Sequence, residues 1–170
     1  WFKCHHPKEY MAALLTSVLD NSDKVAGYIA ECRDCGIALL PPDINHSYDG
    51  FTVEEGGIRF GLAAVKNIGR GFIQSVVRER KEGPFTSLRD FCTRMAGGDL
   101  NKRAMENLIR SGAFDSLGAR RSQLCKIYET VMDSIAESRR QNVEGQMDFF
   151  SMGALSGGEE RKPPQQDILL

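Results

Sequence analysis

The sequence predicts a mainly α-helical protein with one small β-hairpin. Apolar residues recur at helical spacing in several stretches, of which residues 7–20 are the first and residues 121–140 the last. Helix-start and helix-stop residues bound these stretches, including Pro7 at a first helical position and Gly36 after a helix end. Alternating apolar residues on both sides of Gly56-Gly57 predict the hairpin. With 170 residues, the chain has room for one or two small domains.

The N-terminal part is expected to hold two helices and a short strand. The helices cover residues 7–20 and 23–35, and Ser22 is the expected cap of the second. Residues 37–40 form a short apolar run that Pro41-Pro42 ends, as expected for a buried strand. The polar residues that follow, up to Gly50, predict a linker and a candidate domain boundary.

Three further helices are expected after the β-hairpin and the turn that follows it. Ser87-x-x-Asp90 is typical of a capping box, and it predicts a helix to about residue 95. Asn101 is a good cap for the next helix, which ends at Ser111-Gly112. The last helix covers residues 121–140, and the composition from Gly145 onward, rich in Gly, Ser, Pro and Gln, predicts a flexible tail.

Residues 65–73 are the stretch with the clearest functional signal. Ile68 can anchor a tight turn in a core, while Gly69 and Gly71, which have no Cβ, can take positive φ and let another backbone come close. The N–H groups at the start of the following helix have no partner inside it, and they suit a phosphate. An apolar residue followed by Gly-x-Gly between two helices is typical of a helix-hairpin-helix, which binds the nucleic-acid backbone. An ordinary loop between packed helices is the alternative.

Candidate DNA contacts follow from this turn and from one more pair of cations. Lys66 and Arg70 flank the turn with positive charge, and Arg120-Arg121 lies at a helix start, where the helix dipole disfavours cations. A phosphate contact would explain that pair, although a plain exposed pair is the alternative. The predicted DNA-binding residues are Lys66, Asn67, Ile68, Gly69, Arg70, Gly71, Arg120 and Arg121.

Charge is distributed unevenly along the chain, although the net charge is only −1. Residues 1–57 hold four Lys or Arg and nine Asp or Glu, which gives −5. Residues 58–125 hold thirteen and six, which gives +7, and residues 126–170 hold five and eight, which gives −3. A basic block centred on the predicted turn is the pattern expected of a phosphate-binding module.

Metal, cofactor and membrane sites are not predicted. Cys32 and Cys35, together with Cys4, His5 and His6, have the residue types of a zinc site, but the two Cys fall within a helix and near its end. Packing is therefore the preferred interpretation, and the five Cys are expected to be reduced thiols. No apolar run approaches the roughly 18 residues of a membrane span, which predicts a cytoplasmic protein without a membrane partner.

Several stretches together resemble one family. They are residues 1–3, 7–13, 20–21, 36–37, 40–45, 58–69, 101–103, 108–109 and 111–118. The combination is similar to the alpha subunit of bacterial DNA polymerase III, the C-family replicative polymerase, from residue 1 to about residue 150. The chain does not begin with Met, and we expect it to be a piece of a longer protein.

The resemblance implies a domain organisation and a set of partners. Residues 1–47 would end the fingers domain, residues 48–145 would start the clamp-binding domain with a tandem helix-hairpin-helix, and residues 151–170 would be a tail or linker. Duplex DNA, the sliding clamp (beta subunit) and other subunits of the polymerase III holoenzyme are the implied partners. The family's catalytic aspartates and their Mg²⁺ lie upstream, so this fragment is expected to be inactive alone and to need no cofactor.

An internal sliding-clamp peptide is implied in the predicted tail. It consists of Gln146, Met147, Asp148, Phe149 and Phe150. Phe149 stands where the family usually has Leu or Met, which keeps the apolar character. Independently of the resemblance, two adjacent aromatic residues in such a tail are costly unless a partner, or as the alternative the helix at residues 121–140, buries them.

Three alternatives to a main replicase stay open. The chain could be a non-catalytic helix-hairpin-helix module of a repair enzyme, an error-prone relative within the same polymerase family, or a purely structural helical domain. The segment at residues 40–45 and the peptide at residues 146–150 favour a polymerase over the repair module. The basic block disfavours the structural domain.

Overall fold

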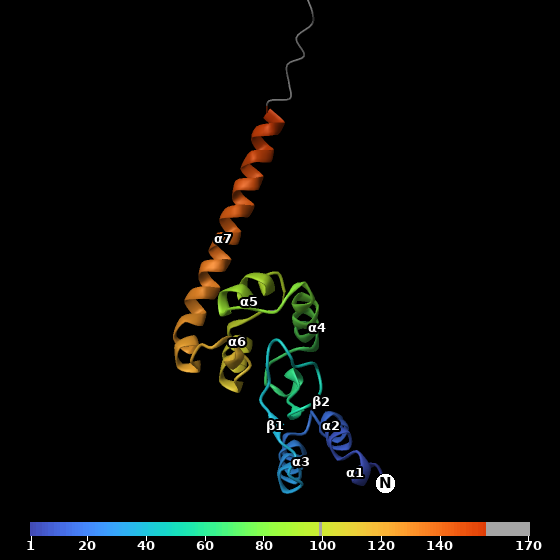
Figure 1. The fold of residues 1–170 in the computed structure, drawn as a ribbon. Helices are drawn as coiled ribbons and strands as arrows, with labels where there is room; N and C mark the ends of the chain where they lie inside the picture. Colours follow the sequence, from blue (N-terminus) through green and yellow to red (C-terminus); the bar gives the residue numbers. More distant parts are fainter. Residues whose placement is uncertain (99, 156–170) are drawn as a thin grey trace, which may run out of the picture. The chain divides into compact units, whose positions relative to one another are not determined.

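The computed structural model describes residues 1–98 and 100–155, with side chains described up to Gln141. Most of this chain is helical and one small sheet is present, so the predicted fold class is confirmed. By contacts, the chain divides into residues 1–135 and residues 136–170. Within the first unit, α1–α3 gather at one end beside the sheet, and α4–α6 lie at the other end (Figure 1).

The N-terminal end holds three helices and a strand. They are α1 (Phe2–His5), α2 (Pro7–Ser17), α3 (Ser22–Asp34) and β1 (Leu39–Leu40). Pro7 is the first residue of α2, as predicted. The cap of α3 is Asn21 rather than Ser22, because the Asn21 side chain accepts a hydrogen bond from the Lys24 N–H at 3.1 Å. Helix α3 therefore begins one residue earlier than predicted.

The strand predicted at residues 37–40 and the predicted hairpin join into one three-stranded sheet, a pairing that the sequence did not predict. Strands β2 (Thr52–Glu54) and β3 (Gly57–Arg59) form the predicted antiparallel hairpin. Strand β1 pairs with β3 in parallel, with Leu39 opposite Ile58. Gly57 has a φ of +148°, and a Cβ there would overlap the Ala38 carbonyl oxygen. The parallel pair therefore depends on a position without a side chain.

The remaining elements surround the predicted turn. They are η1 (Leu62–Ala64), α4 (Arg70–Glu79), η2 (Arg80–Glu82), α5 (Leu88–Met95), α6 (Lys102–Ser111), η3 (Asp115–Leu117) and α7 (Arg121–Leu155). Both predicted caps are present: Ser87 Oγ accepts from the Asp90 N–H at 3.1 Å, and Asn101 Oδ1 accepts from the Ala104 N–H at 2.8 Å. Gly112 ends α6 in the left-handed conformation, with a φ of 90°.

The last helix is longer than predicted. Helix α7 continues to Leu155, whereas the sequence predicted an end near residue 140 and irregular chain from Gly145. Residues 141–155 contain no Pro, and many of them are good helix formers such as Gln, Glu, Met, Ala and Leu. A single Gly within a helix costs only about 1 kcal/mol, so Gly145 is a weak stop.

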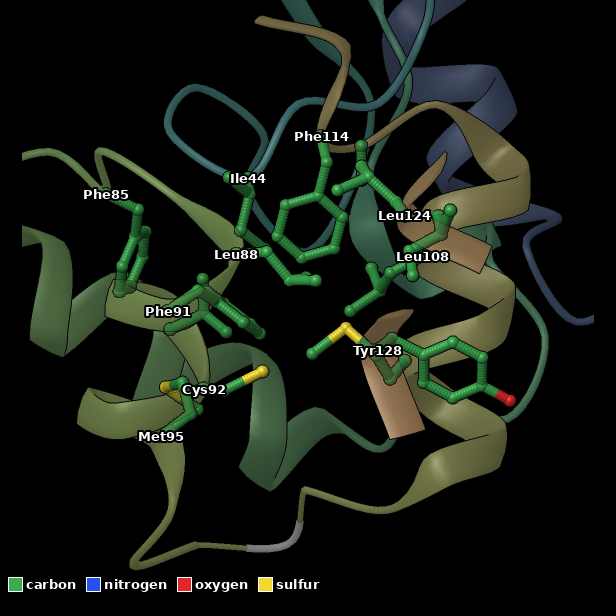
Figure 2. Packing of buried hydrophobic residues seen from close by; sticks show 14 of the residues in the cluster. Ile44, Phe85, Leu88, Phe91, Cys92, Met95, Leu108, Phe114, Leu124 and Tyr128 are labelled. Carbon is green, nitrogen blue, oxygen red and sulfur yellow. The ribbon is translucent and has the colours of Figure 1, made fainter. Parts of the chain in front are cut away.

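Two hydrophobic cores lie within residues 1–135. The smaller core combines Met11 and Leu15 of α2, Cys32 of α3, and Phe51 and Ile58 of the hairpin. The larger core joins α4, α5, α6 and the start of α7, and Figure 2 shows its side chains converging around Phe91 and Phe114. The rings of these two residues meet edge-on, 5.1 Å apart between centroids.

The boundary predicted after residue 47 does not coincide with the division between these cores. Ile44, which precedes it, is fully buried in the larger core, and Phe51, which follows it, belongs to the smaller one. The segment at residues 43–47 thus crosses from one core to the other. The assignment of residues 1–47 to a fingers domain stays a prediction.

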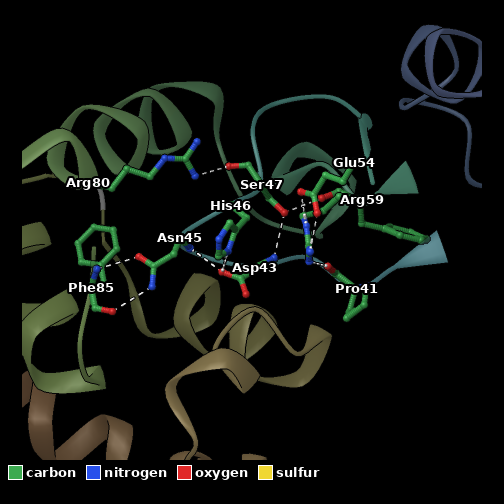
Figure 3. Close-up of polar contacts among 10 residues, drawn as sticks. Pro41, Asp43, Asn45, His46, Ser47, Glu54, Arg59, Arg80 and Phe85 are labelled. Atoms are coloured by element: carbon green, nitrogen blue, oxygen red, sulfur yellow. Dashed lines mark hydrogen bonds and ion pairs between the residues drawn. The ribbon is translucent and has the colours of Figure 1, made fainter. Parts of the chain in front are cut away.

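Polar contacts fix this crossing segment (Figure 3). The Asn45 side chain donates to the Phe85 carbonyl at 2.9 Å and accepts from the Phe85 N–H at 2.8 Å. Ser47 Oγ donates to the Phe60 carbonyl at 2.7 Å and accepts from the Asp43 N–H at 2.9 Å. The Ile44 N–H donates to the Ala113 carbonyl at 2.8 Å. The expected linker is therefore a fixed clasp, which we call the 43–47 clasp.

Replacing Asn45 tests the clasp. Asn45→Ala should lower the free energy of unfolding by about 2 kcal/mol, because two hydrogen bonds are removed and the Phe85 peptide groups keep no replacement. Chemical denaturation measures this change. Asn107→Ala is the control, since it removes one exposed hydrogen bond and should cost less than about 1 kcal/mol. Equal costs for the two variants would contradict a special role of the clasp.

Candidate nucleic-acid interface

The first turn, residues 65–69, has a different backbone from the one predicted. Asn67 takes the left-handed conformation, with a φ of 62°. Gly69 has a φ of −80° and a ψ of 150° and is the N-cap of α4, while Gly71 lies inside the helix. Neither glycine uses the positive φ that it could adopt, and Asn67 takes the left-handed position instead. Asn is the non-glycine residue that tolerates this conformation best, because its short polar side chain can bond locally.

One residue of the first turn packs into the core, and the residues around it are exposed to solvent. Ile68 packs against the larger core, as predicted, whereas Lys66, Asn67, Gly69 and Arg70 are exposed. Asn107 Nδ2 of α6 donates to the Lys66 carbonyl at 2.8 Å, which fixes the start of the turn. A Cβ built on Gly69 meets no protein atom within 4 Å. The glycine is thus not required by the protein's own packing, and its open side leaves room for another molecule.

The start of α4 offers unsatisfied donors beside positive charge. Gly69 provides no side-chain cap, and the first bond of the helix runs from the Ile73 N–H to the Gly69 carbonyl. The N–H groups of residues 70–72 therefore have no partner within the helix. Among the described residues, no carboxylate lies within 4.0 Å of the Lys66 or Arg70 cation. An anion is the ligand that this arrangement suits best.

A second turn of similar construction joins α6 to α7. Leu117 packs against the larger core as Ile68 does, and exposed Gly118, with a φ of 77°, follows it. A basic residue then stands at the helix start: Arg70 is the first residue of α4, and Arg120 directly precedes α7. This turn was not predicted from the sequence, although Leu117-Gly118 shortly before the two arginines is the signal that could have indicated it.

The two arginines of the second turn differ in their surroundings. Arg121 donates from Nε to both carboxylate oxygens of Asp115, at 2.9 and 3.1 Å, and its Nη2 contacts the same carboxylate. These hydrogen bonds hold the pKa of the Asp115 carboxyl below its ordinary value. Arg120 is exposed, and its N–H faces Gln123 Oε1 at 3.4 Å. The Arg121 side chain thus links the start of α7 to η3, and the exposed Arg120 side chain is the more available of the two for an anion.

The thiols do not form a metal site within the described chain. No group of three or more His, Cys, Asp or Glu residues there could hold a metal ion. Cys32 is buried in the smaller core, whereas Cys35 is exposed, so the two thiols face different surroundings. Burial raises the pKa of the Cys92 thiol to about 11. Across the described residues, no helix has the length and apolarity needed to cross a membrane.

The predicted clamp peptide lies in the last part of α7. Residues 146–150 have a helical backbone, although an irregular tail was expected there. The side chains of Gln146, Met147, Asp148, Phe149 and Phe150 lie outside the described part of the chain, as do all of residues 156–170. Clamp binding by this peptide stays a prediction.

The turn geometry and the helices around it define a helix-hairpin-helix protein, and comparison with known families agrees. The family model described as "Helix-hairpin-helix motif" matches residues 36–124, which is more than half of the chain. The chain therefore belongs to the helix-hairpin-helix family. The matched residues include both turns and the 43–47 clasp.

The curated relatives of this chain indicate the kind of protein more specifically than the family model does. The DNA polymerase III subunit alpha of Saccharopolyspora erythraea is 44% identical over 165 residues, covering 96% of this chain and 14% of the relative. The subunits of the same name from Chlamydia pneumoniae and Mycobacterium tuberculosis are 39% and 41% identical, covering 94% and 88% of this chain and 13% of each relative. The resemblance to this polymerase subunit is thus confirmed, and the chain spans about one seventh of the relatives' length.

The fit of Arg121 against Gly112 can be tested with two glycine substitutions. A Cβ on Gly112 would overlap Arg121 Nη2, whereas a Cβ on Gly118 would meet nothing within 4 Å. Both glycines have positive φ, so each change to Ala adds about 1 kcal/mol of backbone strain. Gly112→Ala should cost about 1 kcal/mol more than Gly118→Ala in thermal or chemical unfolding. In an Arg121→Ala background this difference should shrink, and its persistence there would contradict the contact.

Proposed function

We propose that this chain is the part of a bacterial replicative DNA polymerase that holds duplex DNA without sequence preference and tethers the enzyme to its sliding clamp. The observation that carries the proposal is the first turn, where an open glycine, three free N–H groups and two cations lie together. The polymerase III alpha relatives support a role in replication.

The DNA contact would be made through phosphates. Backbone N–H groups at the start of α4 bind one phosphate oxygen at close range, which the bare Cα of Gly69 permits. Lys66 and Arg70 then neutralise neighbouring phosphates, and Arg120 of the second turn adds another cation. Contacts of this kind position a protein on DNA but carry no base information. A replicase, which must move over every sequence, requires such a grip.

The clamp contact would be made through residues 146–150. Phe149 and Phe150 would bury apolar rings in a pocket of the clamp, and Gln146 would orient the peptide through its amide, which both donates and accepts. A second tether raises the effective concentration of the polymerase at its primer end. Processive synthesis by the parent protein, a cytoplasmic DNA-directed DNA polymerase that works with the other holoenzyme subunits, would follow.

The whole protein would supply the chemistry, and this part would supply positioning. The catalytic aspartates and Mg²⁺ of the parent polymerase would lie in the part of the protein that precedes this chain. No residue of this chain is assigned a catalytic role, so primer extension by these 170 residues alone is not expected. A repair-enzyme module remains the second candidate, since the helix-hairpin-helix family itself does not specify replication.

The duplex contact can be measured directly. Binding of the chain to duplexes of different sequence should be equally strong and should weaken with salt, with a log–log slope of about −3 to −5 for three to five neutralised phosphates. Gly69→Val should weaken binding about tenfold, because its branched side chain would occupy the space at the turn. The φ and ψ of Gly69 suit Val, so the melting temperature should hardly change.

A matched control uses another open glycine. Gly27 in α3 is exposed and also has no atom within 4 Å of an added Cβ, so Gly27→Val should leave DNA binding unchanged. Fluorescence anisotropy across a salt series measures all three proteins. Equal binding by the Gly69→Val and Gly27→Val variants would contradict the role of the first turn, and binding without salt dependence would contradict the phosphate contact itself.

The clamp contact can be separated from the DNA contact. Phe149→Ala combined with Phe150→Ala should weaken binding to the sliding clamp by at least about 2 kcal/mol, the scale of interface anchors. Duplex affinity should stay the same, because the two contacts lie in different parts of the chain. Isothermal calorimetry with purified clamp measures the first effect. Unchanged clamp affinity together with a lower melting temperature would show that the two rings belong to the protein's own core.

A further inference from the structure

A groove beside α4 is not explained by the turn contact. It has a volume of about 430 Å³ and lies between the loop at Tyr48-Asp49 and one face of α4 and η2. Four polar or charged side chains line the helical wall, namely Arg70, Gln74, Arg78 and Lys81, and they follow one another at intervals of four, four and three residues. Such intervals place them along one helix face. Ile73 and Val77 form the apolar floor.

The charge of this groove is predominantly positive. Three cations face one carboxylate, that of Asp49 on the loop side. Arg78 is 74% exposed and approaches Glu79 at only 3.7 Å, a distance typical of a weak ion pair. Among the described residues, Arg70 and Lys81 have no carboxylate within ion-pair distance. The groove is therefore suited to an extended anion on its helical side.

The loop wall of the groove is held rigidly. The Arg80 guanidinium lies over the Tyr48 ring, 4.4 Å from its centroid, and donates to the Ser47 carbonyl at 2.7 Å (Figure 3 shows the second contact). The Leu62 N–H donates to the Tyr48 carbonyl at 2.8 Å, and the Ala63 N–H donates to the Asp49 carbonyl at 3.1 Å. A Cβ on Gly61 would overlap the Asp49 carbonyl oxygen, so the two segments of chain are in close contact.

Arg70 belongs both to the first turn and to the groove. From Arg70 to Lys81 the helical wall is about 16 Å long, at roughly 1.5 Å per residue. A DNA backbone that runs along this wall could place several successive phosphates beside its three cations, Arg70, Arg78 and Lys81. A DNA backbone bound at the turn could thus continue along the helical wall of the groove and remain beside positively charged side chains.

We infer that the groove formed by Tyr48, Asp49 and the Arg70–Gln74–Arg78–Lys81 face of α4 and η2 is a second phosphate-binding track, which holds the backbone of the same duplex beyond the first turn. The inference rests on the proposed DNA-holding function and extends it from a point contact to a path. Because the loop wall is already ordered, little conformational entropy is lost on binding. The Asp49 carboxylate repels phosphates on the loop side of the groove, so the DNA phosphates lie against α4 and η2.

Charge changes at Gln74 test the track in both directions. Gln74 is exposed, and Lys and Glu have helix propensities close to that of Gln, so neither variant should disturb α4. In duplex-binding titrations of the full 170-residue chain, Gln74→Lys should tighten binding several-fold and Gln74→Glu should weaken it several-fold. Asp49→Asn should also tighten binding, because it removes the one carboxylate that lines the groove.

Removal of two cations gives the matched comparison. Arg78→Ala with Lys81→Ala should weaken duplex binding about tenfold and should reduce the log–log salt slope by about 2, because each phosphate left without its cation lowers the slope by roughly 0.9. Lys24→Ala with Arg33→Ala changes the net charge equally on exposed α3, and it should leave both quantities nearly unchanged. Thermal unfolding of each variant checks that the fold is retained.

The outcomes distinguish the track from the turn. If Gly69→Val weakens binding but the Gln74 and Arg78/Lys81 variants do not, the track is wrong and the turn contact stands. If the groove variants weaken binding and Gly69→Val does not, the turn contact fails while the track stands. Equal duplex affinity of Gln74→Lys and Gln74→Glu would overturn the track, as expected if the groove instead receives an acidic protein segment. Equal effects on single-stranded DNA would overturn its assignment to the duplex.

Discussion

The structure depends on the hydrogen bonds between Asn45 and the Phe85 peptide groups. Asn45 presents a side-chain amide that replaces a strand partner, donating to the Phe85 carbonyl and accepting from its N–H. This pair fixes the loop that leads into α5, and Phe85 and Phe91 meet within the larger core at 4.9 Å between ring centroids. On its other side, Ser47 bonds to the Phe60 carbonyl just before η1. One short segment thus positions both the core and the approach to the first turn.

The surface proposed to bind DNA is held in place by contacts with the core and with α6. The first turn is held by Ile68 in the larger core and by Asn107 from α6, so its free N–H groups have fixed directions. The groove beside α4 is bounded by a loop that continues directly from the 43–47 clasp. Anion binding at such a site needs little rearrangement, and the affinity then depends mainly on charge and salt.

The features that the sequence predicted correctly depend on interactions between residues that are close together along the chain. Ser87 and Asn101 cap helices as expected because a cap is an interaction between residues three positions apart. The parallel pairing of β1 with β3 was missed because it joins residues about twenty positions apart, and the permissive residue, Gly57, looked like part of a hairpin turn. At the first turn, residue types predicted that Ile68 anchors the turn in the core, and the left-handed position lies at Asn67 rather than at a glycine. The second turn was missed because Leu117 and Gly118 are separated from the helix by two further residues.

The sheet has a consequence for how this protein can be divided. A piece that starts at residue 48 would lose Ile44 from the larger core and β1 from the sheet. Strand β3 would then present an unpaired parallel edge, and such edges recruit strands from neighbouring molecules. A piece that starts at residue 36, where the helix-hairpin-helix match begins, keeps Ile44, β1 and the Gly57 contact together. It still exposes Phe51 and Ile58, which pack against Met11 and Leu15 of α2, so the shortest piece that keeps the sheet and both cores includes α2 and α3.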